Sequence, residues 1–290
     1  MSKVLVTGAS GFIGKALVAR LKASGRKVVP IDSASGDIAE SETLDKFSQA
    51  NISHVFHLAG RTFVPDSWHD PLSFGKTNVL GTINVLEFCR KNNASLTYVS
   101  AYIYGHPETL PIGEDSQIRP SNPYALTKRL AEEACEFYAA AYGMKVNTIR
   151  PFNVYGIGQG ANFLIPLIIE QALTGSQIVV KDLLPKRDYV YLDDLTRALL
   201  ATMDINTENY NVINIGSGTS LSVKEVIDVV QDIAGTSKEI VSDNRVRANE
   251  LMDVIADISK AKTILGWQPE HSFRSGIEKI IHLEQGKVKI

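Results

Sequence analysis

The segment Val4-Leu5-Val6-Thr7-Gly8-Ala9-Ser10-Gly11-Phe12-Ile13-Gly14 decides the fold of this 290-residue chain. It opens with residues typical of a buried strand, continues with a glycine at every third position, and leads into a helical pattern that begins at Lys15. Glycines in such a turn permit positive φ and a close approach of phosphate groups, and the helix that follows offers unpaired N–H groups. The pattern therefore predicts a dinucleotide-binding turn between a strand and a helix.

Asp32 follows the next strand-like run, Val28 to Ile31, and lies 18 residues past Gly14. A carboxylate at this place can accept hydrogen bonds from both hydroxyls of an adenosine ribose, and it would repel a 2′-phosphate. Ser33 behind it is small, and no arginine follows immediately to bind such a phosphate. Asp32 therefore predicts NAD as the cofactor in preference to NADP.

Short β-branched runs alternate with helical segments through the first half of the chain. Further strands are expected over residues 55–58, 96–100 and 145–150, and long helices over 72–91 and 124–142. Such alternation predicts right-handed βαβ units, and with them an α/β fold built on a Rossmann, doubly wound parallel sheet that is covered on both faces.

The composition changes after residue 150, where Gly, Pro and Asn become frequent. We therefore expect two units. The first is a dinucleotide-binding Rossmann domain over residues 1–150, to which about 189–216 returns. The second is a smaller C-terminal α/β substrate lobe over residues 151–188 and 217–290.

Composition narrows the classes of function. Apolar residues make up 44% and charged residues 21% of the chain, as in ordinary globular proteins, and the net charge of −2 does not suggest a nucleic-acid partner. No apolar run approaches the roughly 18 residues that a membrane helix needs. The chain enters a strand directly after Met-Ser-Lys, so we expect no signal peptide and a cytoplasmic location. Cys89 and Cys135 lie in helical patterns and are expected to be buried thiols, with no metal site.

Tyr124 and Lys128 lie four residues apart on a predicted helix and so share one face. A free phenol titrates at about pH 10, and a neighbouring ammonium is expected to lower the pKa of Tyr124 so that it can exchange a proton. Ser100 lies at the carboxyl end of the predicted fourth strand, where ligands bind in open α/β sheets. Its hydroxyl could hydrogen-bond to a substrate oxygen.

Together with the glycine turn and Asp32, the motif His57-Leu58-Ala59-Gly60, Asn78 and the Ser100, Tyr124, Lys128 set resemble the extended short-chain dehydrogenase/reductase family. The resemblance covers essentially the whole chain and is strongest to the nucleotide-sugar epimerase, dehydratase and reductase branch. It implies that Ser100 orients a sugar oxygen, Tyr124 moves a proton, and Lys128 holds the nicotinamide ribose. The cofactor-binding residues that it implies are Gly8, Ser10, Gly11, Phe12, Ile13, Gly14, Asp32, Asp37, Ile38, Leu58, Ala59, Gly60, Asn78, Tyr124 and Lys128.

The same resemblance implies a nucleoside-diphosphate sugar as substrate and a homodimer as the assembly. Asn153 would contact the diphosphate, Phe163 would help to cover the base, and arginines at 187 and 247 would bind the diphosphate through their planar forks. His57 is expected to pack at a strand end. The family commonly dimerises through two long helices, here about 74–91 and 124–142. The substrate-binding residues implied are Ser100, Tyr102, Asn153, Phe163, Arg187 and Arg247.

Relatives of this kind carry out three different reactions, and some have a non-catalytic role. The family's 4,6-dehydratases carry an Asp-Glu pair after the catalytic Ser or Thr, whereas Ala101-Tyr102 stands here, so elimination of water is not expected. An NAD-dependent 4-epimerase is favoured by Asp32. A 4-keto-6-deoxy sugar reductase that consumes external NAD(P)H is favoured by the short chain and the bulk of Tyr102. The epimerase is the leading prediction. A catalytically silent dinucleotide sensor is disfavoured because Ser100, Tyr124 and Lys128 are all present.

Overall fold

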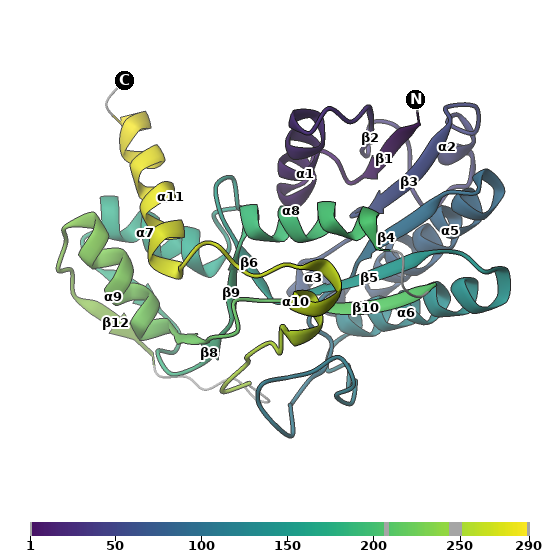
Figure 1. The fold of residues 1–290 in the computed structure, drawn as a ribbon. Helices are drawn as coiled ribbons and strands as arrows, with labels where there is room; N and C mark the ends of the chain where they lie inside the picture. Colours follow the sequence, from purple (N-terminus) through teal and green to yellow (C-terminus); the bar gives the residue numbers. More distant parts are fainter. Residues whose placement is uncertain (1, 206–208, 244–250, 289–290) are drawn as a thin grey trace.

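The computed structural model describes residues 2–205, 209–243 and 251–288, and its main feature is a six-stranded parallel sheet (Figure 1). The strands lie in the order β2-β1-β3-β4-β5-β10, which confirms the predicted α/β class with a doubly wound parallel sheet. Because β2 and β3 flank β1, the crevice beyond the carboxyl ends of β1 and β3 is where such sheets bind ligands. The strand bounds are β1 (Lys3–Thr7), β2 (Val28–Ile31), β3 (Ile52–His57), β4 (Ser95–Val99), β5 (Val146–Pro151) and β10 (Tyr210–Ile215).

Helices cover both faces of this sheet because successive strand residues point to opposite sides. Val4 and Val6 of β1 belong to the hydrophobic cluster beneath α1 and α8, whereas Leu5 belongs to the cluster beneath α5 and α6. Cys89 and Cys135 are buried free thiols in the second cluster. The helices on the first face are α1 (Phe12–Ala23), α8 (Leu192–Ala201) and α10 (Ser259–Leu265), and those on the second are α2 (Glu42–Asp45), α5 (Gly81–Asn92) and α6 (Pro123–Tyr142).

The stretch 72–91, predicted as one helix, is interrupted by a π-helical segment. α4 (Pro71–Phe74) leads into the π-helical η1 (Gly75–Leu80), which continues as α5. Such wide turns are rare and frequently mark functional positions. This one carries Asn78, whose side chain exchanges hydrogen bonds with the backbone of Arg61 in the loop after β3. The π-helical segment therefore coincides with contacts between residues distant in the sequence. The local spacing of apolar residues could not predict it.

A third hydrophobic cluster lies in the part of the chain predicted to form the second lobe, where α7, α9 and α11 pack against short strands. The helix α9 begins with a capping box between Ser222 and Glu225 and ends at Gly235, which has the left-handed conformation. The predicted lobe boundaries stay a prediction, although α10 and Trp267 pack into the cluster on the α1 face of the main sheet. The remaining elements are α3 (Val64–His69), β6 (Asn153–Tyr155), α7 (Leu164–Thr174), β7 (Ile178–Val180), β8 (Lys186–Arg187), β9 (Tyr189–Tyr191), η2 (Thr202–Asp204), β11 (Leu221–Ser222), α9 (Val223–Ala234), β12 (Ile240–Ser242) and α11 (Phe273–Val288).

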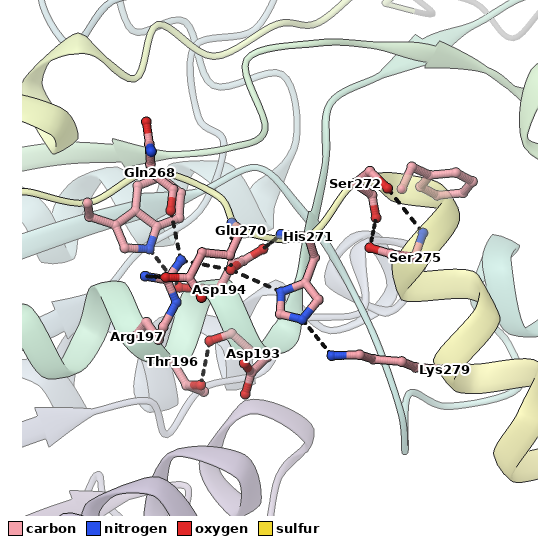
Figure 2. Close-up of polar contacts among 12 residues, drawn as sticks. Asp193, Asp194, Thr196, Arg197, Gln268, Glu270, His271, Ser272, Ser275 and Lys279 are labelled. Atoms are coloured by element: carbon pink, nitrogen blue, oxygen red, sulfur yellow. Dashed lines mark hydrogen bonds and ion pairs between the residues drawn. The ribbon is translucent and has the colours of Figure 1, made fainter.

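A buried carboxylate ties the segment between α10 and α11 to the helix α8. Asp194 accepts hydrogen bonds from the backbone N–H groups of Glu270 and His271, both at 3.0 Å, and from the Arg197 guanidinium at 2.9 Å (Figure 2). The Trp267 indole N–H donates to the Asp194 carbonyl at 2.9 Å. These bonds hold the pKa of Asp194 below its usual range despite its burial. They tie the segment that leads into α11 to the helix on the face of the main sheet.

Candidate active site

The glycine turn forms a cradle of bare backbone at the carboxyl end of β1. Gly8 has a φ of +67°, and a Cβ atom there would lie 2.7 Å from the Ala59 nitrogen. A Cβ atom on Gly14 would overlap the Gly8 carbonyl oxygen, so glycine is required at both positions. The first turn of α1 has neither a capping side chain nor an acidic residue. Its unpaired N–H groups therefore suit a pyrophosphate, and the cradle fits the predicted dinucleotide.

The residues predicted to bind the adenosine half of the dinucleotide follow β2, which flanks β1 on the side opposite to β3. Ile31 pairs with Thr7, and its carbonyl accepts the Ala9 N–H at 3.0 Å, so Asp32 lies directly beside the glycine turn. The Asp32 carboxylate is half-buried and accepts the backbone N–H of Ala34 at 3.1 Å. Beyond it, the segment Asp37-Ile38 is fixed to α5, since the Asn84 amide donates to the Ile38 carbonyl at 3.1 Å.

Asn78 joins the loop after β3 to the helix α6. Its side-chain oxygen accepts the Arg61 N–H at 2.8 Å, and its amide nitrogen donates to the Arg61 carbonyl at 3.1 Å. The same nitrogen donates to the Thr127 hydroxyl at 3.0 Å, and that hydroxyl donates to the Tyr124 carbonyl at 2.8 Å. The loop that contains Leu58-Ala59-Gly60 is thereby tied to the turn that carries Tyr124.

Lys128, Ser100 and Gly60 meet at the carboxyl ends of β3 and β4. The Lys128 ammonium is buried, donates to the Val99 carbonyl at 2.8 Å, and lies 4.8 Å from the centre of the Tyr98 ring. A Cβ atom on Gly60 would lie 3.6 Å from the same ammonium. The buried Ser100 hydroxyl has no hydrogen-bond partner among the described residues. It is thus available to a substrate oxygen, which fits its predicted role.

The charge state of Tyr124 differs from the expectation drawn from the sequence. Burial raises the pKa of Tyr124, so the expected lowering by Lys128 is wrong for this structure. The reason is that the Lys128 ammonium contacts the Val99 carbonyl and the Tyr98 ring. Burial lowers the pKa of Lys128 to about 8, against the opposing charge of Glu132. Tyr124 is therefore a phenol at neutral pH, and its ring packs edge-on to Phe74 with the ring centres 6.4 Å apart.

Two of the predicted substrate residues lie on short strands, Asn153 on β6 and Arg187 on β8. The Asn153 side chain donates to the Asp188 carbonyl at 3.2 Å, which fixes its amide. The Arg187 guanidinium donates to the Leu251 carbonyl at 2.6 Å, and its charge acts on the nearby Tyr102 phenol.

The other predicted substrate residues are less closely grouped. The Tyr102 hydroxyl donates to the Gly105 carbonyl, and its ring lies edge-on to those of Tyr104 and Phe152, at 5.6 and 5.3 Å between centres. Phe163 is exposed at the start of α7. Arg247 lies outside the described residues.

Sequence reasoning missed the aromatic rings that pack beside Tyr124 and Lys128. It also gave no hydrogen bonds to His57. Tyr98 and Phe74 lie on the buried faces of a strand and a helix, where their spacing signals only a core. His57 was expected only to pack, yet both of its ring nitrogens are hydrogen-bonded, to Thr7 and Thr82. Its place in the motif before Leu58-Ala59-Gly60 was the available signal.

The part of the chain that the structure describes contains neither a metal-binding group of side chains nor a membrane-spanning helix. Within residues 2–205, 209–243 and 251–288, no three His, Cys, Asp or Glu side chains are grouped closely enough to hold a metal ion. Over the same ranges, each helix is too short or too polar to cross a membrane.

Comparison with known proteins places these features in a family. The model of the "NAD dependent epimerase/dehydratase family" matches residues 4–216. UDP-glucose 4-epimerase of Corynebacterium glutamicum is 31% identical over 302 residues, which cover 93% of this chain and 92% of the relative. GDP-6-deoxy-D-mannose reductase of Pseudomonas aeruginosa is 31% identical over 301 residues, which cover 99% and 98%. A crystal structure of UDP-glucose 4-epimerase with UDP-glucose from Thermotoga maritima has a TM-score of 0.93 and 30% identity, with 99% of both chains covered.

Proposed function

We propose that this chain, which belongs to the NAD dependent epimerase/dehydratase family, is an NAD-dependent 4-epimerase of nucleoside-diphosphate sugars. At the coarser level it is a nucleotide-sugar epimerase or reductase of the extended short-chain dehydrogenase/reductase type. The observation that carries the finer proposal is Asp32, half-buried beside the glycine turn. A carboxylate there binds a ribose diol and repels a 2′-phosphate. An NAD that remains bound suits a reaction that regenerates its cofactor in every turnover.

The site residues can be given roles in such a reaction. When bound, the dinucleotide would supply a hydride acceptor, and in its reduced form a hydride donor, for carbon 4 of the sugar. The free Ser100 hydroxyl donates a hydrogen bond to the sugar O4. As the phenolate, Tyr124 would accept the O4 proton as the C4–H bond breaks and give it back as that bond forms again. Because burial keeps Tyr124 a phenol in this structure, its proton must first leave, and the positive charge of a bound nicotinamide would favour that loss. Lys128 would supply a hydrogen-bond donor for the cofactor ribose.

A 4-keto-6-deoxy sugar reductase is the second candidate, and Tyr102 is the observation that favours it. The ring lies two residues after Ser100 and is held by the rings of Tyr104 and Phe152 and by the Gly105 carbonyl. A fixed ring there would restrict the rotation of a keto sugar between two hydride transfers. A reductase needs no such rotation. Burial raises the pKa of Tyr102 to about 12, so its hydroxyl stays protonated and the residue acts here through the bulk of its ring.

The cofactor carried through purification separates these two functions. We expect protein purified without added cofactor and then denatured to release NAD in a molar ratio close to one, identified by mass spectrometry. An epimerase gains nothing from exchanging its cofactor, whereas a reductase must exchange it in every cycle. An empty site that takes up NADPH would contradict the proposal and favour the reductase.

We also propose that two copies of the chain pair through α6. Leu126, Leu130 and Phe137 form one stripe on this helix and are 50%, 42% and 60% exposed. A second copy would cover the stripe, as the family resemblance implies. We expect a dimer in sedimentation velocity and a monomer for Phe137→Glu, because the carboxylate would be buried without a partner. A monomeric native protein would contradict this assembly.

A further inference from the structure

His57 lies at the end of β3, fully buried, in a chain of hydrogen bonds that reaches the cofactor cradle. Its Nδ1 atom is 2.7 Å from the Thr7 hydroxyl, and that hydroxyl accepts the Ala59 N–H at 3.1 Å. Its Nε2 atom is 3.0 Å from the Thr82 hydroxyl, which donates to the Asn78 carbonyl at 2.6 Å. The ring thus connects the turn around the expected dinucleotide to the π-helical segment η1.

One form of the imidazole satisfies every donor and acceptor in this hydrogen-bonded chain. The Asn78 carbonyl can only accept, so the single Thr82 proton points to it, and the Thr82 oxygen must accept from His57 Nε2–H. A neutral ring then has no proton on Nδ1, which accepts the Thr7 O–H. Burial, and secondarily the charge of Lys128, lower the pKa of His57 to about 3, so the ring is neutral. In this arrangement every member of the chain is satisfied.

The hydrogen-bond network continues from Asn78 to α6, the helix that carries Tyr124 and Lys128. The Asn78 side chain bonds to the backbone of Arg61 and to the Thr127 hydroxyl, and Thr127 bonds to the Tyr124 carbonyl. A second route is by packing. The His57 ring lies 5.7 Å from the Tyr98 ring, and the Lys128 ammonium lies over that ring. Both Tyr124 and Lys128 are therefore positioned by groups that His57 contacts directly or through hydrogen bonds.

We propose that His57, as the neutral Nε2–H tautomer, is a positioning residue. It holds the cofactor cradle and α6, the helix that carries Tyr124 and Lys128, in fixed positions relative to each other. The proposal rests on the proposed function, since it concerns the same dinucleotide and the same proton transfer. It predicts that the two ring nitrogens act through different partners. Nδ1 anchors the Thr7 and Ala59 side, and Nε2 anchors Asn78.

A matched control for His57 is His54, which lies on the same strand, β3. It is also buried, and its ring nitrogens are bonded to the hydroxyls of Ser95 at 2.7 Å and Thr97 at 3.0 Å. Its partners continue to Thr202, away from the residues of the site. His54→Phe and His57→Phe therefore remove similar buried hydrogen bonds, but only His57→Phe disturbs the network around Tyr124 and Lys128.

We expect both variants to lose similar stability, measured by denaturant unfolding. Only His57→Phe should also weaken NAD binding and lower kcat, by about 10- to 100-fold, because small displacements of catalytic groups are costly. His57→Gln, whose amide can still donate to Thr82, should recover part of kcat. Thr82→Val should cause a similar loss of kcat. The double variant with His57→Phe should lose little more than either single variant, because both substitutions interrupt the same hydrogen-bond network.

The tautomer is tested separately, by ¹H–¹⁵N spectra of histidine-labelled native protein with His57 assigned from the spectrum of His57→Phe. We expect an unprotonated Nδ1 and a protonated Nε2. A protonated Nδ1, or a His57→Phe variant that loses stability like His54→Phe but keeps kcat and NAD affinity, would overturn the proposal. If the native protein fails to epimerise, the tautomer and the NAD affinities still decide the role of His57, so the two failures can be told apart.

Discussion

Replacement of Tyr124 by Phe is expected to lower kcat by roughly 10²- to 10⁴-fold while NAD stays bound, since the variant loses only the hydroxyl that exchanges the O4 proton. The ring of Tyr124 packs edge-on to Phe74, and the first turn of α6 is capped by Asn122, whose side chain accepts the Ala125 N–H at 2.8 Å. Phenylalanine keeps both contacts. The measurement compares turnover with the content of bound dinucleotide.

Tyr142 provides the control, because it lies on the same helix, is 52% exposed and is remote from the site in sequence. Tyr142→Phe should leave turnover unchanged. Turnover by Tyr124→Phe at the native rate would remove Tyr124 from the mechanism. Loss of bound NAD in that variant would show a binding role in place of the proton transfer.

The second large effect concerns stability, and it arises from a buried ion pair on α6 and β5. Arg150 donates to the two Glu132 oxygens, at 2.6 to 3.2 Å, and also to the Tyr104 hydroxyl at 2.9 Å. Both charged side chains are almost completely buried. Arg150→Met would leave the Glu132 carboxylate without its partner, so we expect the free energy of unfolding to fall by about 3 to 5 kcal/mol.

Denaturant unfolding measures this loss, with Arg90→Met as the control. Arg90 also pairs with a carboxylate, that of Glu87, but on the surface of α5, where water screens the charges. We expect a much smaller change for Arg90→Met. Adding Glu132→Leu to Arg150→Met should recover part of the lost stability, because the unpaired charge is then removed. Equal losses for Arg150→Met and Arg90→Met would contradict the account.

Much of the fold follows from local patterns. The strand Val28–Ile31 has the bounds that the sequence predicts, and the helix Val223–Ala234 is marked by local signals at both of its ends. The helix is well defined because Ser222 and Glu225 cap its start and Gly235 ends it. The π-helical segment around Asn78 was not predictable, because the helical spacing continues through it. It coincides with bonds to Arg61, a residue 17 positions earlier in the chain.

The candidate site likewise has features that the sequence predicts and features that only the structure shows. The glycine turn, Asp32 and the set of Ser100, Tyr124 and Lys128 are visible in the sequence because their chemistry requires particular residues at particular spacings. The raised pKa of Tyr124 was not visible, because it depends on burial and on where the Lys128 ammonium is held.

The 4-epimerase assignment is tested most directly by following a hydrogen label on the sugar. Native protein with its retained cofactor would be incubated with UDP-glucose deuterated at C4, without added dinucleotide, and the products would be read by NMR and mass spectrometry. We predict UDP-galactose that keeps the deuterium at C4, because the hydride returns to the carbon that it left. The contradicting result is no interconversion of this or other nucleotide hexoses, together with oxidation of added NADPH by a 4-keto-6-deoxy nucleotide sugar.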